Sequence, residues 1–253
     1  MNGGNGSPFA LSGAVYLKSP TRRSAAHLDD LTREVAEASG TSLFWHTQMA
    51  KLHDPFAEEL PWDDLSTWVR GSLQDPENAE RIAFAIQSSP TEIELLRANL
   101  LDVLESIPAT SRRRTVAPPG GELGLMVMHR AAIPTGSTCG NVAEVVAQMS
   151  NATADVWFHH LIEEAWLLPG ETPLIEWLCV AGAEAMAVRL EEDVSRGLNV
   201  RSLRAAAVAR WRRASAGTRI AAAIERREGG PESESRLLAA RLARRAVRGR
   251  EAS

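Results

Sequence analysis

The sequence contains only two cysteines and one tyrosine among its 253 residues, and aromatic residues make up 5% of the chain. Two cysteines cannot build a disulfide framework, and Cys139 and Cys179 do not have a metal-ligand spacing. The hydrophobic runs are much shorter than the roughly 20 residues that a membrane-spanning helix needs. The N-terminus lacks the basic region of a signal peptide. We therefore expect a cytoplasmic protein without a transmembrane segment.

Charge is distributed unevenly along the chain. The formal net charge is −4, from 28 basic and 32 acidic residues. Residues 201–253 hold 14 arginines and 5 glutamates, a local charge of +9, which leaves −13 for residues 1–200. A basic end on an acidic body indicates a partner of opposite charge, and that partner could be the body itself.

Hydrophobic periodicity predicts a mainly α fold. Leu28, Leu31 and Val35 recur at helical spacing, and a capping box at residues 91–94 begins the clearest helix. Two short apolar runs, 14–17 and 125–128, have the character of strands. Each run comes before a series of helical segments, so we expect a short strand at the start of each series.

The order of these segments repeats, which predicts an internal duplication. Val142, Val145 and Met149 reproduce the spacing of Leu28, Leu31 and Val35, 114 positions later. An aromatic–histidine motif ends at His46 and again at His159, and Trp177 corresponds to Trp68. We expect the two strands to pair across the join. The predicted organisation is a disordered leader (1–13), helical unit 1 (14–107), a linker (108–121), helical unit 2 (122–213) and Arg-rich C-terminal helices (214–253).

Several motifs of the first unit follow one another in a recognisable order: Ala-Ala-His-Leu at 25–28, Ser-Leu-Phe-Trp-His at 42–46, Asp-Leu-Ser-Thr-Trp at 64–68 and Leu-Leu-Arg at 95–97. This order resembles a prokaryotic family of small helical domains of unknown function, whose pattern is Ala-x-Ser-Leu, Ser-aromatic-His, Asp-Phe-x-x-Trp and Leu-Arg. The resemblance covers about residues 14–106, with the second unit a more divergent copy. It implies that His46 and Trp68 are motif positions, and it implies no reaction.

Two histidine–glutamate pairs suggest a metal site. His159 with Glu163, and His160 with Glu164, have the i, i+4 spacing that lets two side chains of a helix bind one ion. Helical phase places the first pair beside the buried stripe and the second pair on the solvent face. The predicted metal ligands are therefore His159, Glu163 and His46. The alternative is that these histidines lie at the edge of the core, with one ring nitrogen bonded to a backbone carbonyl.

No catalytic constellation is evident, since the sequence has no P-loop, nucleophile elbow or Cys–His pair. The Arg-rich region offers a different kind of site, because basic amphipathic helices bind acidic proteins or nucleic acid phosphates. Its candidate interaction residues are Arg210, Arg212, Arg213, Arg241, Arg244, Arg245 and Arg248.

Three functional hypotheses follow. The first is a non-catalytic helical protein, without a cofactor, that acts by binding another protein. The second is an enzyme that binds a divalent metal or a small molecule around His46, His159 and Glu163. The third is nucleic-acid binding through the Arg-rich region, for which affinity would fall steeply with salt.

Overall fold

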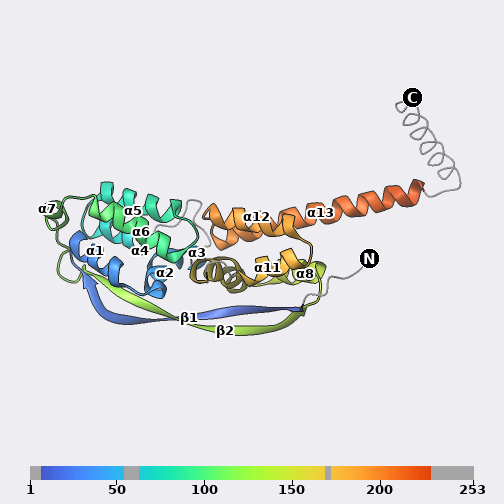
Figure 1. Ribbon diagram of the computed structural model, residues 1–253, viewed down its shortest axis with the longest axis horizontal. Helices are drawn as coiled ribbons and strands as arrows, with labels where there is room; N and C mark the ends of the chain where they lie inside the picture. Colours follow the sequence, from blue (N-terminus) through green and yellow to red (C-terminus); the bar gives the residue numbers. More distant parts are fainter. Residues whose placement is uncertain (1–6, 54–62, 169–171, 229–253) are drawn as a thin grey trace, which may run out of the picture. The chain divides into compact units, whose positions relative to one another are not determined.

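A long antiparallel ribbon of two strands organises the fold (Figure 1). The computed structural model describes residues 7–53, 63–168 and 172–228, with side chains up to residue 215. Strand β1 is Phe9–Ala25 and strand β2 is Leu123–Cys139, each 17 residues long, and Tyr16 lies opposite Arg130 near the middle. The predicted pairing of the two strands is confirmed, although both extend well beyond the short runs that predicted them.

The rest of the described chain is mostly helical, as predicted. In the sequence, helices α1 to α7 come between β1 and β2. Helices α8 to α13 and one π-helical segment, η1, follow β2. Their bounds are α1 Leu28–Glu37, α2 Gly40–Gln48, α3 Ala50–His53, α4 Asp64–Gly71, α5 Pro76–Ser88, α6 Ile93–Glu105, α7 Ala109–Arg112, α8 Val142–Asn151, α9 Ala154–Phe158, η1 His159–Glu163, α10 Glu164–Leu167, α11 Pro173–Val180, α12 Glu184–Ser195 and α13 Val200–Glu228. The chain divides into two compact units after Ala205, within α13.

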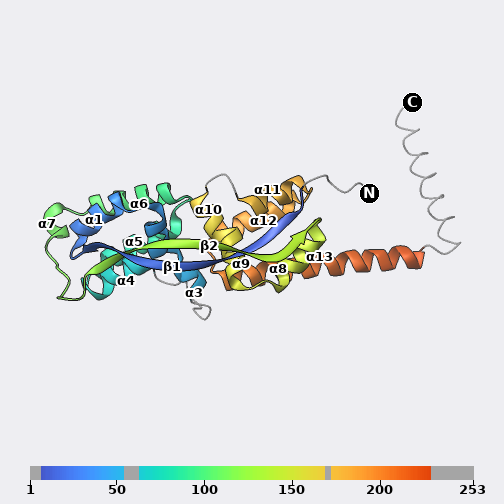
Figure 2. The same ribbon diagram turned by 90° about the horizontal axis from the view of Figure 1, so that it is seen from below.

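In the first of these units the helices lie on one face of the ribbon (Figures 1 and 2). Successive side chains of a strand point to opposite faces, so each strand offers alternate residues to the helices. Ala14 and Met128 are buried against them, whereas Val15, Leu17 and Ile133 on the other face are exposed. The ribbon therefore has a covered inner face and an open outer face.

The start of β1 corrects one sequence expectation. Residues 9–13 belong to the strand, although 1–13 was expected to be a disordered leader. Phe9 and Leu11 are buried, and the Phe9 ring packs on the rings of His160 and Trp177, with centroids 5.2 and 5.8 Å away. These long-range contacts bury the apolar side chains at the start of β1 and so order this segment.

The ribbon has an irregular segment near each end. Its register shifts between Pro20 and Ser24 in β1, and between Pro134 and Thr138 in β2. The hydroxyl of Thr21 donates to the Leu125 carbonyl at 2.9 Å, and that of Thr135 donates to the Leu11 carbonyl at 2.8 Å. The residue after each of these threonines has a positive φ: 63° for Arg22 and 78° for Gly136. The two irregular segments thus share one local structure.

Gly136→Ala is expected to lower the free energy of unfolding by about 1–2 kcal/mol, because a side chain disfavours the left-handed region. A Cβ at this position would meet no atom within 4 Å, so backbone strain alone causes the loss. The matched control is Gly71→Ala at the end of α4, which also meets open space but has no positive φ. It should be neutral or slightly stabilising in urea denaturation. Equal losses in both variants would contradict the strain argument.

Candidate functional site

The π-helical segment η1 carries the cluster of titratable side chains that the sequence singled out. Such segments are rare and often lie at functional sites. His159, His160, Glu163 and Glu164 are all buried. The expectation that His160 and Glu164 face solvent is wrong, because β1 crosses that side of the helix and contacts His160 through Ser12 and Phe9.

Glu163 is the centre of this cluster, and its side chain is 0% exposed. It accepts hydrogen bonds from His159 Nδ1 at 2.7 Å and from the Tyr16 hydroxyl at 2.8 Å, and it pairs with Arg130 Nη1 at 3.2 Å. Burial alone would raise the pKa of Glu163, but the hydrogen bonds from His159 and Tyr16 and the charge of Arg130 outweigh it and lower this pKa. Burial first, and then the Glu163 charge, raise the pKa of Tyr16. Glu163 is therefore the ionised acceptor of this cluster, and Tyr16 is a donor.

His160 is bonded to the backbone of β1. Its Nε2 accepts the Ser12 N–H at 3.0 Å, and its Nδ1 lies 3.2 Å from a Glu164 oxygen. Nε2 can accept only through its lone pair, so this pattern assigns the ring proton to Nδ1, which donates to Glu164. His160 is therefore a neutral acceptor for a strand N–H.

His46 makes the same kind of contact elsewhere in the fold. Its Nε2 accepts the Met126 N–H of β2 at 3.0 Å, and its Nδ1 lies 2.9 Å from an Asp64 oxygen. The His46 ring is buried and hydrogen-bonded to the backbone. However, it accepts this bond from an N–H, whereas the alternative hypothesis expected a bond to a backbone carbonyl. His46 lies on α2 and Asp64 on α4, so residue spacing within one helix could not predict this pair.

These contacts limit what a metal ion could use. His159, His160 and Glu164 offer ligand atoms that all lie within 4.8 Å of one another. One nitrogen of His160 accepts the Ser12 N–H and the other carries the assigned proton, so ligation through either nitrogen would require the loss of the bond to Ser12. The remaining two residues fall short of the three or four protein ligands that zinc usually takes. Of the predicted ligands, His159 contacts Glu163, while His46 bonds to Met126 and Asp64. The metal site stays a prediction.

Aromatic rings pack beside this cluster. Phe44 and Phe158 are fully buried and contact edge to face, with centroids 5.8 Å apart, and Tyr16 packs on Phe158 at 5.4 Å. Trp68 is buried, and its indole N–H donates to the Gly121 carbonyl. Trp177 is only partly buried, because it lies near the end of the ribbon, where its N–H donates to Ser7.

A model of the family of unknown function DUF5752 matches residues 6–208. The chain belongs to the DUF5752 family. The resemblance found in the sequence is thus confirmed, and the match covers both strands and not only residues 14–106. No curated protein matches the chain.

The DUF5752 fold also occurs in a solved structure, that of OrfY from Thermoproteus tenax. The two share 22% sequence identity with a TM-score of 0.69, over 83% of this chain and 95% of OrfY. At this identity the likeness concerns the fold. Within the described residues, no helix has the length and apolar character needed to cross a membrane.

The predicted interaction residues of this DUF5752 chain lie partly on α13. Arg212 and Arg213 are exposed there, and Arg210 is partly buried. The others, Arg241, Arg244, Arg245 and Arg248, lie outside the described residues. Binding through the Arg-rich region therefore stays a prediction.

Proposed function

We propose that this chain is a non-catalytic binding protein built from two tandem copies of one helical unit. In this proposal it contacts a different protein through the open face of the ribbon that the two copies share. The exposed, uncharged and largely apolar character of that face is the observation that carries the proposal.

The first support for the duplication is a pair of exchanged contacts. Met126 lies 114 positions after Ser12, and His160 lies 114 positions after His46. The N–H of Ser12 bonds to His160, and the N–H of Met126 bonds to His46, both at 3.0 Å. Each strand is thus bonded to the helix that follows the other strand. The contacts match His46 with His160, although the sequence alignment paired it with His159.

The same offset of 114 relates further polar details. It relates Thr21 to Thr135, which make matching hydroxyl bonds, and the two positive-φ residues that follow them. The caps of α1 and α8 also match, because His27 and Asn141 each accept the N–H three residues later at 3.0 Å. Hydrophobic periodicity does not produce such agreements, so they support descent from one ancestral unit.

The histidine–glutamate cluster is where the two copies differ. At the same offset the first copy has Trp45 where the second has His159, and Met49 where the second has Glu163. Glu163 is held by Tyr16 from β1 and by Arg130 from β2, which are paired with each other across the ribbon. Because this cluster links both strands to η1 through Glu163, it is better suited to joining the copies than to catalysis.

The open face of the ribbon is the candidate contact surface. We define the outer strip as Ile133 and the three pairs that face away from the helices: Val15 with Ala131, Leu17 with His129 and Ser19 with Val127. The strip contains no Asp, Glu, Lys or Arg, although 24% of the chain is charged. Val15, Leu17 and Ile133 are 45%, 64% and 50% exposed. The solvated face of an antiparallel sheet is usually polar, and exposed apolar patches often mark interaction sites.

Charge argues for a different protein as the partner. A nucleic acid would require basic residues in the strip to neutralise its phosphates. A second copy would bring together two bodies whose residues 1–200 each carry a net charge of −13, and like charges repel. A different protein with an apolar contact surface requires no basic residues in the strip and does not bring two copies of the acidic body together.

Site-specific photo-crosslinking in the native cell tests this proposal. A photoreactive amino acid at position 17 or 133 should give one discrete crosslinked protein, because both positions lie on the outer strip. The matched control is position 84, since Phe84 is 71% exposed on α5, away from the ribbon. The same crosslinked protein at all three positions, or a crosslink only to a second copy of this chain, would overturn the proposal.

A further inference from the structure

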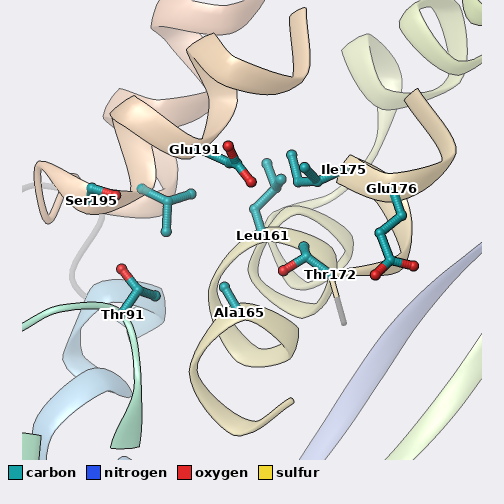
Figure 3. A pocket seen from close by; sticks show the side chains of 9 residues that line it. Thr91, Leu161, Ala165, Thr172, Ile175, Glu176, Glu191 and Ser195 are labelled. Atoms are coloured by element: carbon teal, nitrogen blue, oxygen red, sulfur yellow. The ribbon is translucent and has the colours of Figure 1, made fainter. Parts of the chain in front are cut away.

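We infer that a pocket between η1, α11 and α12 binds a small organic cation with an apolar stem. The pocket has a volume of about 340 Å³ and lies within the first compact unit (Figure 3). This volume is near the lower end of the range of small-molecule sites, about 300–1,000 Å³. At about 30 Å³ per water volume, it accommodates a molecule of about ten non-hydrogen atoms. The inference does not depend on the proposed protein partner.

The lining of the pocket is apolar at its centre and acidic at its sides. Leu161 from η1 and Ile175 from α11 provide apolar surface, and the Glu191 carboxylate of α12 lies near both of them (Figure 3). Glu176 supplies a second carboxylate from α11. Thr91, Thr172 and Ser195 add hydroxyl groups, and none of the described residues that line the pocket is a lysine, arginine or histidine. Such a surface attracts a positive charge and buries a hydrocarbon stem.

The two carboxylates are available to a ligand. Neither the Glu176 nor the Glu191 side chain forms a hydrogen bond or ion pair with any described residue. Their neighbour Glu192, in contrast, pairs with Arg189 at 2.6 Å. Both carboxylates line the pocket and come from different helices, so a flexible stem with a cationic group at each end matches their chemistry. An aliphatic guanidine–amine has this chemistry.

Agmatine is a suitable probe, because it has a guanidinium and an ammonium group joined by a four-carbon stem. Calorimetric titration of the full chain at low ionic strength should detect agmatine binding that weakens with added salt. Glutarate, an anion of comparable length, should not bind, and 1-pentanol should bind more weakly than agmatine. Binding of 1-pentanol as tight as that of agmatine, or no detectable agmatine binding, would overturn the inference.

Matched glutamine variants locate the binding. Glu176→Gln and Glu191→Gln should each weaken agmatine binding about two- to five-fold, as expected for exposed ion pairs, and the double variant should weaken it further. Glu192→Gln removes the same charge from α12 outside the pocket and should leave the affinity unchanged. An equal loss in Glu192→Gln would show diffuse attraction to the acidic body and would overturn the site. Glu176 and Glu191 are exposed and Glu192 is partly exposed, and unchanged melting curves would establish that the variants fold.

Discussion

Glu163→Gln is expected to lower the free energy of unfolding by about 3 kcal/mol. The substitution removes the charge that pairs with Arg130 and His159 and leaves His159 facing a neutral amide inside the protein. The expected loss is at the lower end of the range for broken buried pairs, because Arg130 is 39% exposed and can turn into solvent.

Urea denaturation at neutral pH measures this loss. Glu192→Gln is the control, because it breaks an exposed pair with Arg189 and should change the free energy of unfolding by less than about 1 kcal/mol. A loss in Glu163→Gln no larger than that of the control would contradict the central role of Glu163.

The effect of Glu163→Gln should also depend on pH in a defined direction. The folded chain lowers the pKa of Glu163, so its stabilising contribution is present above the pKa that the unfolded chain has, about 4.3. The contribution is lost as the pH falls through the lower, folded pKa. The difference in stability between the original chain and Glu163→Gln should therefore shrink below about pH 4. A difference that grows on acidification would contradict the assigned direction.

Phe158→Ala and Phe44→Ala are each expected to lower the free energy of unfolding by about 3–5 kcal/mol. Both rings are fully buried and pack edge to face, and each truncation leaves a cavity between α2 and α9. Phe84→Ala is the control, because Phe84 is 71% exposed and its truncation should cost less than about 0.5 kcal/mol.

The double variant tests whether the two rings stabilise each other. Contacting aromatic rings contribute about 0.5–1.5 kcal/mol beyond their buried area, so the combined loss should differ from the sum of the single losses by about this amount. Additive losses in a thermodynamic cycle would show that the rings are stabilised independently. That result would contradict close packing between α2 and α9.

Structural features that depend on residues close together in the sequence could be predicted well. The helix beginning at Pro76 follows from Asp75 as its cap and from the proline itself, and the structure shows both. The two strands were recognised only in part, because Pro20 and Pro134 suggest turns, whereas the structure places both within the strands. The expected capping box at 91–94 is absent, since α6 begins after Glu92 with no side-chain cap.

The candidate site could be predicted only in part. The spacing of His159 and Glu163 correctly indicated that they meet. The burial of His160 and Glu164 could not be foreseen, because Ser12 lies 148 positions before the histidine that it contacts. The same applies to Tyr16, which lies 147 positions before Glu163. Helical phase identifies the faces of a helix but not which strand from a distant part of the chain will cover one of them.

In the proposed function, the outer strip binds a protein and the buried cluster joins the two copies. The most direct test is the affinity of the purified chain for the protein identified by crosslinking at position 17. Leu17→Lys is expected to weaken this affinity at least about ten-fold, a loss of about 1.4 kcal/mol, because it places a charge in an apolar contact. Phe84→Lys should leave the affinity unchanged. Full affinity in Leu17→Lys, or an equal loss in both variants, would contradict the claim that the open face of the ribbon binds a protein.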